Sequence, residues 1–303
     1  MSDRTVSIVM PTRNGAATLP AVLEAIGRQR VDFPVEIVAV DSGSTDGSAE
    51  LLRSRADVFV EVPRLQFDHG LTRNAGVERA HGDLVVLLVQ DAVPATDGWL
   101  AALTRPLAAD ESVAGTYARQ MPRPDASAIA RHYLSQWTGA SDEPRVAACD
   151  DRAAFDALGP AERMRRCTFD NVCSCIRRSV WDAHPFRATP IAEDLEWARE
   201  VLLAGYRLAY VPDAVVMHSH DRSARYELAR TYLLHHRLYE LFHLRTIPTV
   251  ASLARAMASS SAHHLRCERS AHALALAVAW PLGQYLGGLA GARGWNPVRP
   301  RNV

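Results

Sequence analysis

The chain has 303 residues, of which 48% are hydrophobic and 22% charged, and its formal net charge is +0. This composition is that of a globular protein and excludes a disordered or fibrous chain. The balanced charge also argues against a nucleic-acid partner held by bulk electrostatics. Because residues 1–4 carry no basic, apolar leader and the 5 cysteines include no CxxC pair, we predict a cytoplasmic protein without a disulfide framework.

The first 90 residues alternate between strand-like and helix-like segments. Apolar β-type runs predict strands at residues 6–10, 35–40, 58–62 and 84–89. Helical spacing and N-terminal signals predict helices at residues 17–28, from about residue 46, and at 71–80. This alternation predicts an α/β fold with a mostly parallel central sheet, flanked by helices.

The pattern loosens after residue 94. We predict helices at 98–107, 179–184 and 191–204, and strands at 113–120, 168–176 and 206–211, with the last strand ending at Pro212. Residues from about 219 onward read as helical, so we divide the chain into a catalytic domain, 1–220, and a helical C-terminal region, 221–303. The apolar stretch 272–290 is interrupted by Pro281 and several glycines. We expect it to be too short and too interrupted to span a membrane, and we predict a buried or membrane-surface helix instead.

Two predicted strands end in a carboxylate. The run 84–89 stops at Gln90-Asp91-Ala92, and the run 35–40 stops at Asp41. Ligands of parallel sheets bind beyond the carboxyl ends of the strands. An aspartate after a buried strand is costly unless it meets a cation or donors, and Mg²⁺ binds through one or two carboxylates together with ligand phosphates. The two strand ends therefore predict a polyphosphate ligand with a divalent cation.

Two loops beyond these strands carry further polar groups. The turn that begins with Pro11, Thr12 and Arg13 offers free backbone N–H groups and the Arg13 guanidinium, which suit a base or phosphate. Asp41 is followed by Ser42 and Ser44, whose hydroxyls suit a ribose and base edges, and by Gly43, which allows close backbone approach. The same residues also fit an ordinary βα loop and a helix N-cap, and both interpretations stay open.

Two further groups lie later in the chain. Glu193 and Asp194 point about 100° apart on a helix, so one can face a cleft as a general base while the other complements the helix dipole; we assign the base to Asp194. His218 and His220 share one side of an extended segment. We predict that His218 completes a metal site with Asp91.

Taken in order, these segments resemble an inverting nucleotide-sugar glycosyltransferase of family 2. The resemblance covers roughly the first 220 residues and implies the GT-A type of nucleotide-binding α/β fold. The stretches that carry it are 6–15, 38–46, 70–76, 82–94, 169–181, 192–197 and 213–220. The form Gln90-Asp91-Ala92 in place of Asp-x-Asp is similar to bacterial rhamnosyltransferases of O-antigen and cell-wall glycan assembly.

The resemblance also implies roles. L-rhamnose from dTDP-rhamnose would pass to a hydroxyl of a glycan or lipid-linked acceptor, with Mg²⁺ or Mn²⁺ as cofactor, in the cytoplasm or at the inner face of the cell membrane. Asp91 and His218 would bind the metal, and Asp194 would be the catalytic base. The substrate-binding residues would be Pro11, Thr12, Arg13, Asp41, Ser42, Ser44, Arg73, Asn74, Gln90, Asp91, Asn171 and Glu193.

Other interpretations remain. The donor could be a UDP- or GDP-linked sugar. A sugar-phosphate nucleotidyltransferase would usually have a glycine-rich loop with arginine near the first strand. Residues 11–15, which follow the first strand here, are a poor match to such a loop. A zinc hydrolase could be built from Asp91, His218 and His220, and a non-catalytic glycan-binding protein would leave Glu193 and Asp194 without a role.

Overall fold

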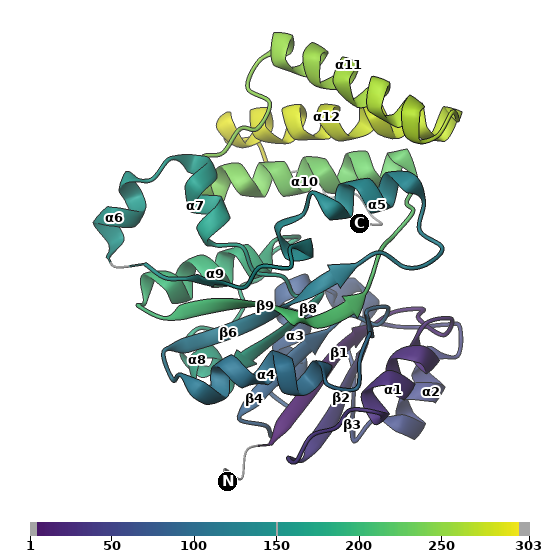
Figure 1. Cartoon of the computed structure of the whole chain (residues 1–303), viewed down its shortest axis with the longest axis vertical. Coiled ribbons are helices and arrows are strands. Elements are labelled where there is room, and N and C mark those ends of the chain that lie inside the picture. The colour runs from purple at the N-terminus through teal and green to yellow at the C-terminus, as the bar shows by residue number, and fades with distance from the viewer. Residues whose placement is uncertain (1–4, 150, 297–303) are drawn as a thin grey trace.

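The computed structural model describes residues 5–149 and 151–296. Within them one mixed sheet is flanked by helices, and a helical region follows at the C-terminal end (Figure 1). This arrangement confirms the predicted fold class. Residues 1–4, from which we predicted that no leader is present, lie outside the described residues.

The N-terminal half of the sheet is parallel. Its strand order is β3-β2-β1-β4, with β1 (Val6–Thr12) between β2 (Val35–Asp41) and β4 (Leu84–Leu88), and with β3 (Val58–Glu61) beyond β2. The helices between these strands are α1 (Leu19–Gly27), α2 (Ser48–Arg55), the short η1 (Arg64–Gln66) and α3 (His69–Val77). The alternation expected from the sequence is present, and it brings the ends of β1, β2 and β4 to one edge.

The C-terminal half mixes directions. β8 (Cys173–Arg177) is antiparallel to both β4 and β6 (Val113–Met121), and β6 is parallel to β9 (Arg207–Met217). Two short strands that we did not predict, β5 (Val93–Pro94) and β7 (Arg145–Ala147), pair antiparallel with β9. The helices of this half are α4 (Trp99–Ala109), α5 (Ala128–Ser135), η2 (Thr138–Ala140), α6 (Arg152–Ala157), α7 (Pro160–Arg166), α8 (Arg178–Ala183) and α9 (Glu193–Leu203).

Two predicted strand boundaries are wrong. β9 does not end at Pro212 but runs on to Met217. Its register with β6 jumps from Ala118↔Val211 to Arg119↔Val215, so Pro212 lies at an irregularity where no ladder N–H is needed. β8 starts at Cys173 and not at residue 168, because Asp170 accepts a hydrogen bond from the Val172 N–H and turns the chain there.

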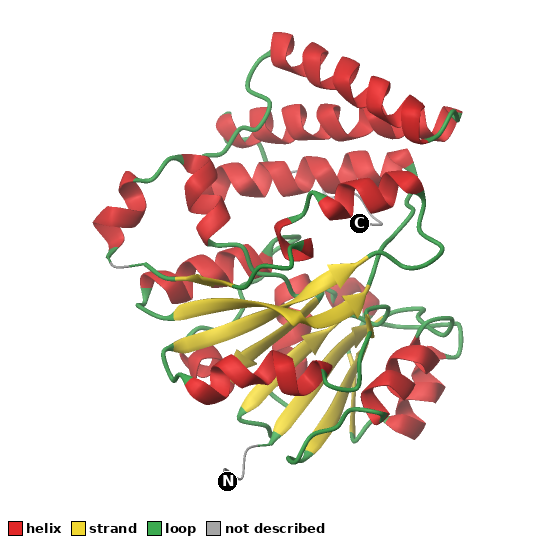
Figure 2. Ribbon diagram, viewed as in Figure 1, coloured by secondary structure: helices red, strands yellow, loops and turns green. Residues whose placement is uncertain are grey.

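Helices cover both faces of the sheet (Figure 2), and alternate strand residues pack against them. Val9, Val38 and Leu87 belong to one core with α3, α8 and α9, whereas Ile8, Met10 and Leu88 belong to the other with α1 and α4. Because both faces are covered, the carboxylates that follow the apolar runs of β2 and β4, Asp41 and Asp91, lie at the strand ends. The ligand-binding edge is therefore the place where the sheet can carry charge.

The C-terminal region consists of α10 (Ala224–Phe242), α11 (Val250–Cys267) and α12 (Ala271–Ala292). Gly283, Gly287 and Gly291 of α12 face α10 so closely that a Cβ on Gly287 would lie 2.2 Å from the Tyr232 carbonyl oxygen. By length and composition α12 is able to cross a membrane, which corrects our prediction that the segment falls short. Half of its apolar window is nevertheless buried within the protein.

The division at residue 220 stays a prediction. Leu238 and Phe242 of α10 are buried in the same core as α9 and the central sheet. Arg237 of α10 also forms an ion pair of 2.5 Å with Glu196 of α9. The first C-terminal helix is thus packed directly on the α/β part of the chain.

Candidate active site

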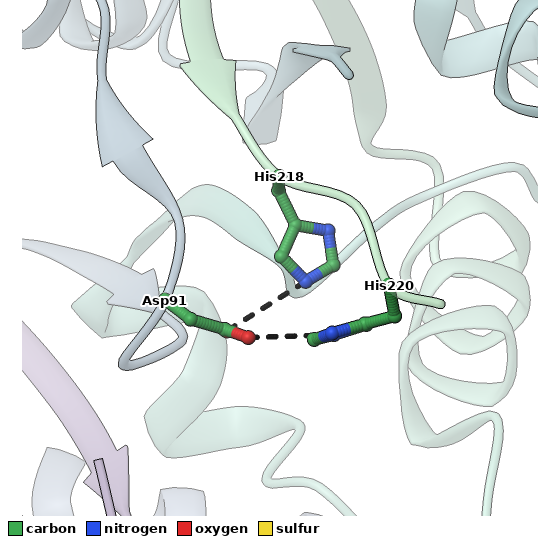
Figure 3. A group of neighbouring side chains, drawn as sticks. All are labelled: Asp91, His218 and His220. Atoms are coloured by element: carbon green, nitrogen blue, oxygen red, sulfur yellow. Dashed lines mark ion pairs between the residues drawn. The ribbon is translucent and has the colours of Figure 1, made fainter. Parts of the chain in front are cut away.

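A carboxylate and two imidazoles meet at the end of β4. β5 pairs with β9 so that Val93 is opposite Met217, which brings the preceding Asp91 beside the following His218. The Asp91 carboxylate lies 3.7 Å from His218 Nε2 and 3.4 Å from His220 Nε2 (Figure 3). One ligand atom from each of the three residues lies within 4.8 Å of the others. The predicted pairing of Asp91 with His218 is present, and His220 joins it.

The His218 ring is oriented by Gln120, a buried residue near the end of β6. His218 Nδ1 lies 2.8 Å from Gln120 Oε1, an oxygen that only accepts hydrogen bonds. Nδ1 therefore carries the proton, and the Nε2 lone pair faces Asp91. Burial lowers the pKa of His218 to about 4, although the Asp91 charge opposes this, so the ring is neutral near pH 7.

Asp170 extends this network into the protein. The Gln120 amide nitrogen donates to Asp170 Oδ2, and the Trp137 indole N–H donates to the same oxygen at 3.2 Å. The other oxygen, Oδ1, accepts from the Val172 N–H at 2.9 Å. A continuous chain of hydrogen bonds thus joins Trp137, through Asp170 and Gln120, to His218.

The predicted nucleotide loops lie next to each other. Ser44 Oγ accepts from the Asn14 N–H at 2.9 Å, and one carboxylate oxygen of Asp41, Oδ2, accepts from the N–H groups of Gly43 and Ser44. The other oxygen, Asp41 Oδ1, is buried without a partner among the described residues, and so is the Ser42 hydroxyl. Buried polar atoms without partners are rare, and these two are placed to bind a ligand that donates hydrogen bonds.

Pro11, Thr12 and Arg13 lie at the end of β1, beside Asp41. Thr12 is buried, and its hydroxyl donates to the Met10 carbonyl, whereas the Arg13 side chain is exposed. Asn14 adopts a left-handed backbone with φ 50°, which turns the chain away from the strand. Of these residues, Arg13 leaves its side chain available to a ligand at the surface.

Gln90, for which we predict a substrate contact, bonds to the backbone of the β1–α1 loop. Its Oε1 accepts from the Arg13 N–H at 2.6 Å, and its Nε2 donates to the Arg13 carbonyl at 3.0 Å. A Cβ on Gly15 would lie 2.8 Å from the Gln90 side chain, so the glycine makes room for the amide. The amide of Gln90 therefore holds the β1–α1 loop against the end of β4.

The two adjacent acids of α9 have different surroundings. Glu193 is buried and forms an ion pair of 3.1 Å with Arg73. Burial would raise its pKa, but the Arg73 and His69 charges outweigh burial and lower it. The pKa of Asp194 is raised well above the usual range by burial first, and then by the charges of Glu193 and Asp170. Ala192, just before them, is left-handed with φ 62°.

Arg73 and Asn74 were predicted to support the nucleotide, but their side chains bond to protein groups. Arg73 donates to the His69 carbonyl and pairs with Glu193. The Asn74 amide donates to the Phe186 carbonyl at 2.7 Å and accepts from the Trp181 indole at 2.9 Å. Both residues thus fix the segment that leads to α9, and their support of the nucleotide stays a prediction.

Asn171 links the acids to the end of β8. Its amide nitrogen donates to Glu193 Oε1 at 3.3 Å, its amide oxygen accepts from the Ser174 hydroxyl at 2.8 Å, and its backbone N–H lies 3.5 Å from Asp194 Oδ2. All these side-chain contacts are internal. Asn171 therefore positions Asp194 and Glu193 relative to the sheet.

From the sequence we named His220 only for the alternative zinc site, and we assigned Gln120 and Asp170 to no site. The alternation of His218 and His220 was the available signal for the second imidazole. Gln120 and Asp170 gave no such signal. Gln120 lies within β6 and Asp170 precedes β8, and only the sheet order β8-β6-β9 brings them together.

Comparison with known proteins agrees with this geometry. Residues 7–171 match the model of Glycosyl transferase family 2. The O-antigen chain rhamnosyltransferase RfbN of Salmonella typhimurium strain LT2 is 30% identical over 232 residues, which are 75% of this chain and 70% of the relative.

Two solved structures show the same fold. The mannosyltransferase PcManGT from Pyrobaculum calidifontis, in complex with GDP-Man and Mn²⁺, has a TM-score of 0.56 at 19% identity, covering 98% of this chain and 77% of that one. The glucosyl-3-phosphoglycerate synthase of Mycobacterium tuberculosis with Mn²⁺, UDP and glucosyl-3-phosphoglycerate has a TM-score of 0.57 at 19% identity, covering 80% and 81%. By its family match and its overall identity to RfbN, the chain belongs to glycosyltransferase family 2.

Proposed function

We propose that this glycosyltransferase transfers L-rhamnose from dTDP-rhamnose to a hydroxyl of a glycan or lipid-linked acceptor, with inversion at the anomeric carbon. The observation that carries the proposal is the shared edge of the sheet, where Asp41 lies at the end of β2, Asp91 after β4 and His218 after β9. The identity to O-antigen rhamnosyltransferases supports rhamnose as the sugar. UDP- and GDP-linked sugars are the alternative donors.

The nucleotide would bind at the ends of β1 and β2. The free oxygen of Asp41 and the free hydroxyl of Ser42 are both buried, and a pyrimidine base or ribose supplies N–H or O–H groups to such acceptors. The exposed Arg13 guanidinium would approach the diphosphate, since guanidinium groups bind phosphate oxygens in a bidentate manner. Pro11, Thr12 and Ser44 would shape the walls of this part of the site.

The residues after β4 and β9 fit a divalent cation. Asp91 offers a carboxylate and His218 a lone pair held in place by Gln120, with His220 beside them. Imidazole ligands suit transition metals better than Mg²⁺, so this set favours Mn²⁺. A bound cation there would offset negative charge on the leaving diphosphate.

Asp194 is the proposed general base. Its partner Glu193 is held in an ion pair with Arg73, which leaves Asp194 as the carboxylate that can take a proton. A raised pKa brings a base closer to the working pH, where it takes a proton from a sugar hydroxyl more effectively. Arg73, Asn74, Asn171 and Gln90 would act by positioning the loops and acids around the substrates.

The test is nucleotide release from a panel of dTDP-rhamnose, UDP-glucose and GDP-mannose, with Mn²⁺, Mg²⁺ or neither. We expect dTDP-rhamnose with Mn²⁺ to turn over fastest. Asp194→Asn should lower acceptor-dependent turnover by about 10²- to 10⁴-fold, because a positioned base contributes that much, while dTDP affinity stays close to the wild-type value. The matched control is Asp156→Asn, an exposed acid on α6.

Two outcomes would contradict the proposal. Unchanged turnover in Asp194→Asn would remove the base assignment. Tightly bound zinc in the purified protein, with no nucleotide release from any donor, would favour a hydrolase built on Asp91, His218 and His220. The cytoplasm, at the inner face of the membrane, stays the predicted location of the reaction.

A further inference from the structure

Two adjoining cavities lie outside the residues assigned to the donor. The larger, of about 620 Å³, is lined by Trp137, residues 159–162, Met164, Arg165 and Thr168. The smaller, of about 390 Å³, is lined by residues that include Tyr117, Tyr210, Arg145, Arg165 and Arg166. Arg165 and Thr168 belong to both linings, so the two cavities share a wall.

Trp137 forms a fixed apolar wall of the larger cavity. Its one polar atom, the indole N–H, is bonded to Asp170 at 3.2 Å. The remaining indole atoms carry no hydrogen-bonding group. A sugar ring has one face made of C–H groups, and such a face packs on the electron-rich face of an aromatic ring.

The larger cavity is connected to Asp170 through its wall residue Trp137, whose indole N–H donates to that carboxylate. Thr168, in its wall, is two residues before Asp170, and the Asn171 N–H lies 3.5 Å from Asp194 Oδ2. The Asp170 charge also raises the pKa of Asp194, which places the two carboxylates within electrostatic reach of each other. A ligand held against Trp137 would therefore contact a residue that is hydrogen-bonded to Asp170, and the Asp170 charge acts on the proposed base.

The smaller cavity is positively charged. Arg145 lies over the Tyr210 ring at 4.7 Å, and Arg165 and Arg166 both pair with Glu162. The guanidinium groups of Arg145, Arg165 and Arg166 are thus all found in the lining of the smaller cavity. Guanidinium groups in such a wall suit a phosphate, whose oxygens accept two parallel hydrogen bonds from each arginine.

From this arrangement we propose that the two cavities form the acceptor subsite of the enzyme. The larger cavity binds the acceptor's sugar ring against Trp137, and the arginines of the smaller cavity bind a phosphate joined to that sugar. The inference rests on the proposed function, because the subsite has a purpose only if Asp194 is the base of a sugar transfer.

The test uses glucose 1-phosphate, galactose 1-phosphate and mannose 1-phosphate as probes, with the free sugars and inorganic phosphate for comparison. Binding is followed by saturation-transfer NMR in the presence of dTDP and Mn²⁺. We expect at least one hexose 1-phosphate to bind more tightly than its free sugar and than phosphate. Trp137→Ala should weaken that binding about tenfold, a loss of the size expected for one aromatic contact, and Arg165→Ala should remove the advantage of the phosphate.

Two further variants separate stacking from the hydrogen bond to Asp170. Trp137→Phe keeps an aromatic ring but lacks the indole N–H, so it should bind the probe far better than Trp137→Ala. Trp295→Ala removes an exposed tryptophan elsewhere on the surface and should leave probe binding unchanged.

The subsite is overturned if no hexose 1-phosphate binds, if binding is unchanged in Trp137→Ala, or if dTDP affinity falls in the same proportion in that variant. Nucleotide release from the donor panel is measured on the same preparations. This measurement distinguishes a failure of the acceptor subsite from a failure of the proposed transferase function. Release by the wild-type enzyme without an effect of Trp137→Ala on probe binding would leave the transferase standing and remove only the subsite.

Discussion

His218 Nδ1 lies 2.8 Å from Gln120 Oε1, and this contact determines which nitrogen of the ring is available beside Asp91. Gln120 is held in turn by Asp170, to which its amide nitrogen donates. The Asp170 carboxylate accepts a hydrogen bond from Gln120 Nε2. If the Gln120 amide rotated to present Nε2 to His218, it would lose this hydrogen bond to Asp170. The orientation of the His218 ring is thus set by two buried residues, Gln120 and Asp170.

Gln120 is therefore expected to affect metal binding without being a ligand. Gln120→Ala removes the acceptor for the His218 Nδ1–H, so the ring loses its fixed orientation. Groups that orient a metal ligand in this way typically contribute 10- to 100-fold in metal affinity or activity. We expect the Mn²⁺ concentration for half-maximal turnover to rise by about that factor. Gln136→Ala, at an exposed position after α5, is the control, and an unchanged Mn²⁺ requirement in Gln120→Ala would argue against the orienting role.

Glu193 is expected to set the pH at which Asp194 becomes active. Turnover that needs a deprotonated Asp194 rises with pH through the pKa of that residue, which burial and the Glu193 charge raise. Glu193→Gln removes the like charge and leaves Arg73 unpaired nearby; both changes lower the pKa of Asp194.

The acid limb of the pH profile of kcat/KM should accordingly move to lower pH in Glu193→Gln. A general loss of activity with the limb in its original place would show that Glu193 acts only through folding. Glu24→Gln, an exposed acid on α1, serves as the matched variant for the profile.

Gln90 is expected to support donor binding through the Arg13 loop. Gln90→Asp places a second carboxylate next to Asp91, but a shorter carboxylate cannot donate to the Arg13 carbonyl, so the loop loses at least one of its two bonds. With each bond contributing about 1 kcal/mol, the donor KM should rise about fivefold or more. Gln90→Glu keeps the acceptor for the Arg13 N–H and should give an intermediate value. A lower donor KM in Gln90→Asp would instead indicate that position 90 serves better as a metal ligand.

The sequence by itself determined the N-terminal half of the fold and the positions of the main acids. Apolar runs that end at Asp41 and Asp91 are local features, and the alternation of strands and helices leaves few ways to order them. The separation of Glu193 from Asp194 also follows from helical geometry, because neighbouring residues on a helix point in different directions.

Only the tertiary structure decided which side chains meet. Gln120, Asp170 and Trp137 lie far from His218 in the sequence, and the order of β8, β6 and β9 brings them into one chain of hydrogen bonds. Whether Gln90 faces a ligand or the Arg13 backbone depends on how closely the β1–α1 loop approaches the end of β4. Such contacts depend on strand pairing and loop packing, which local periodicity does not encode.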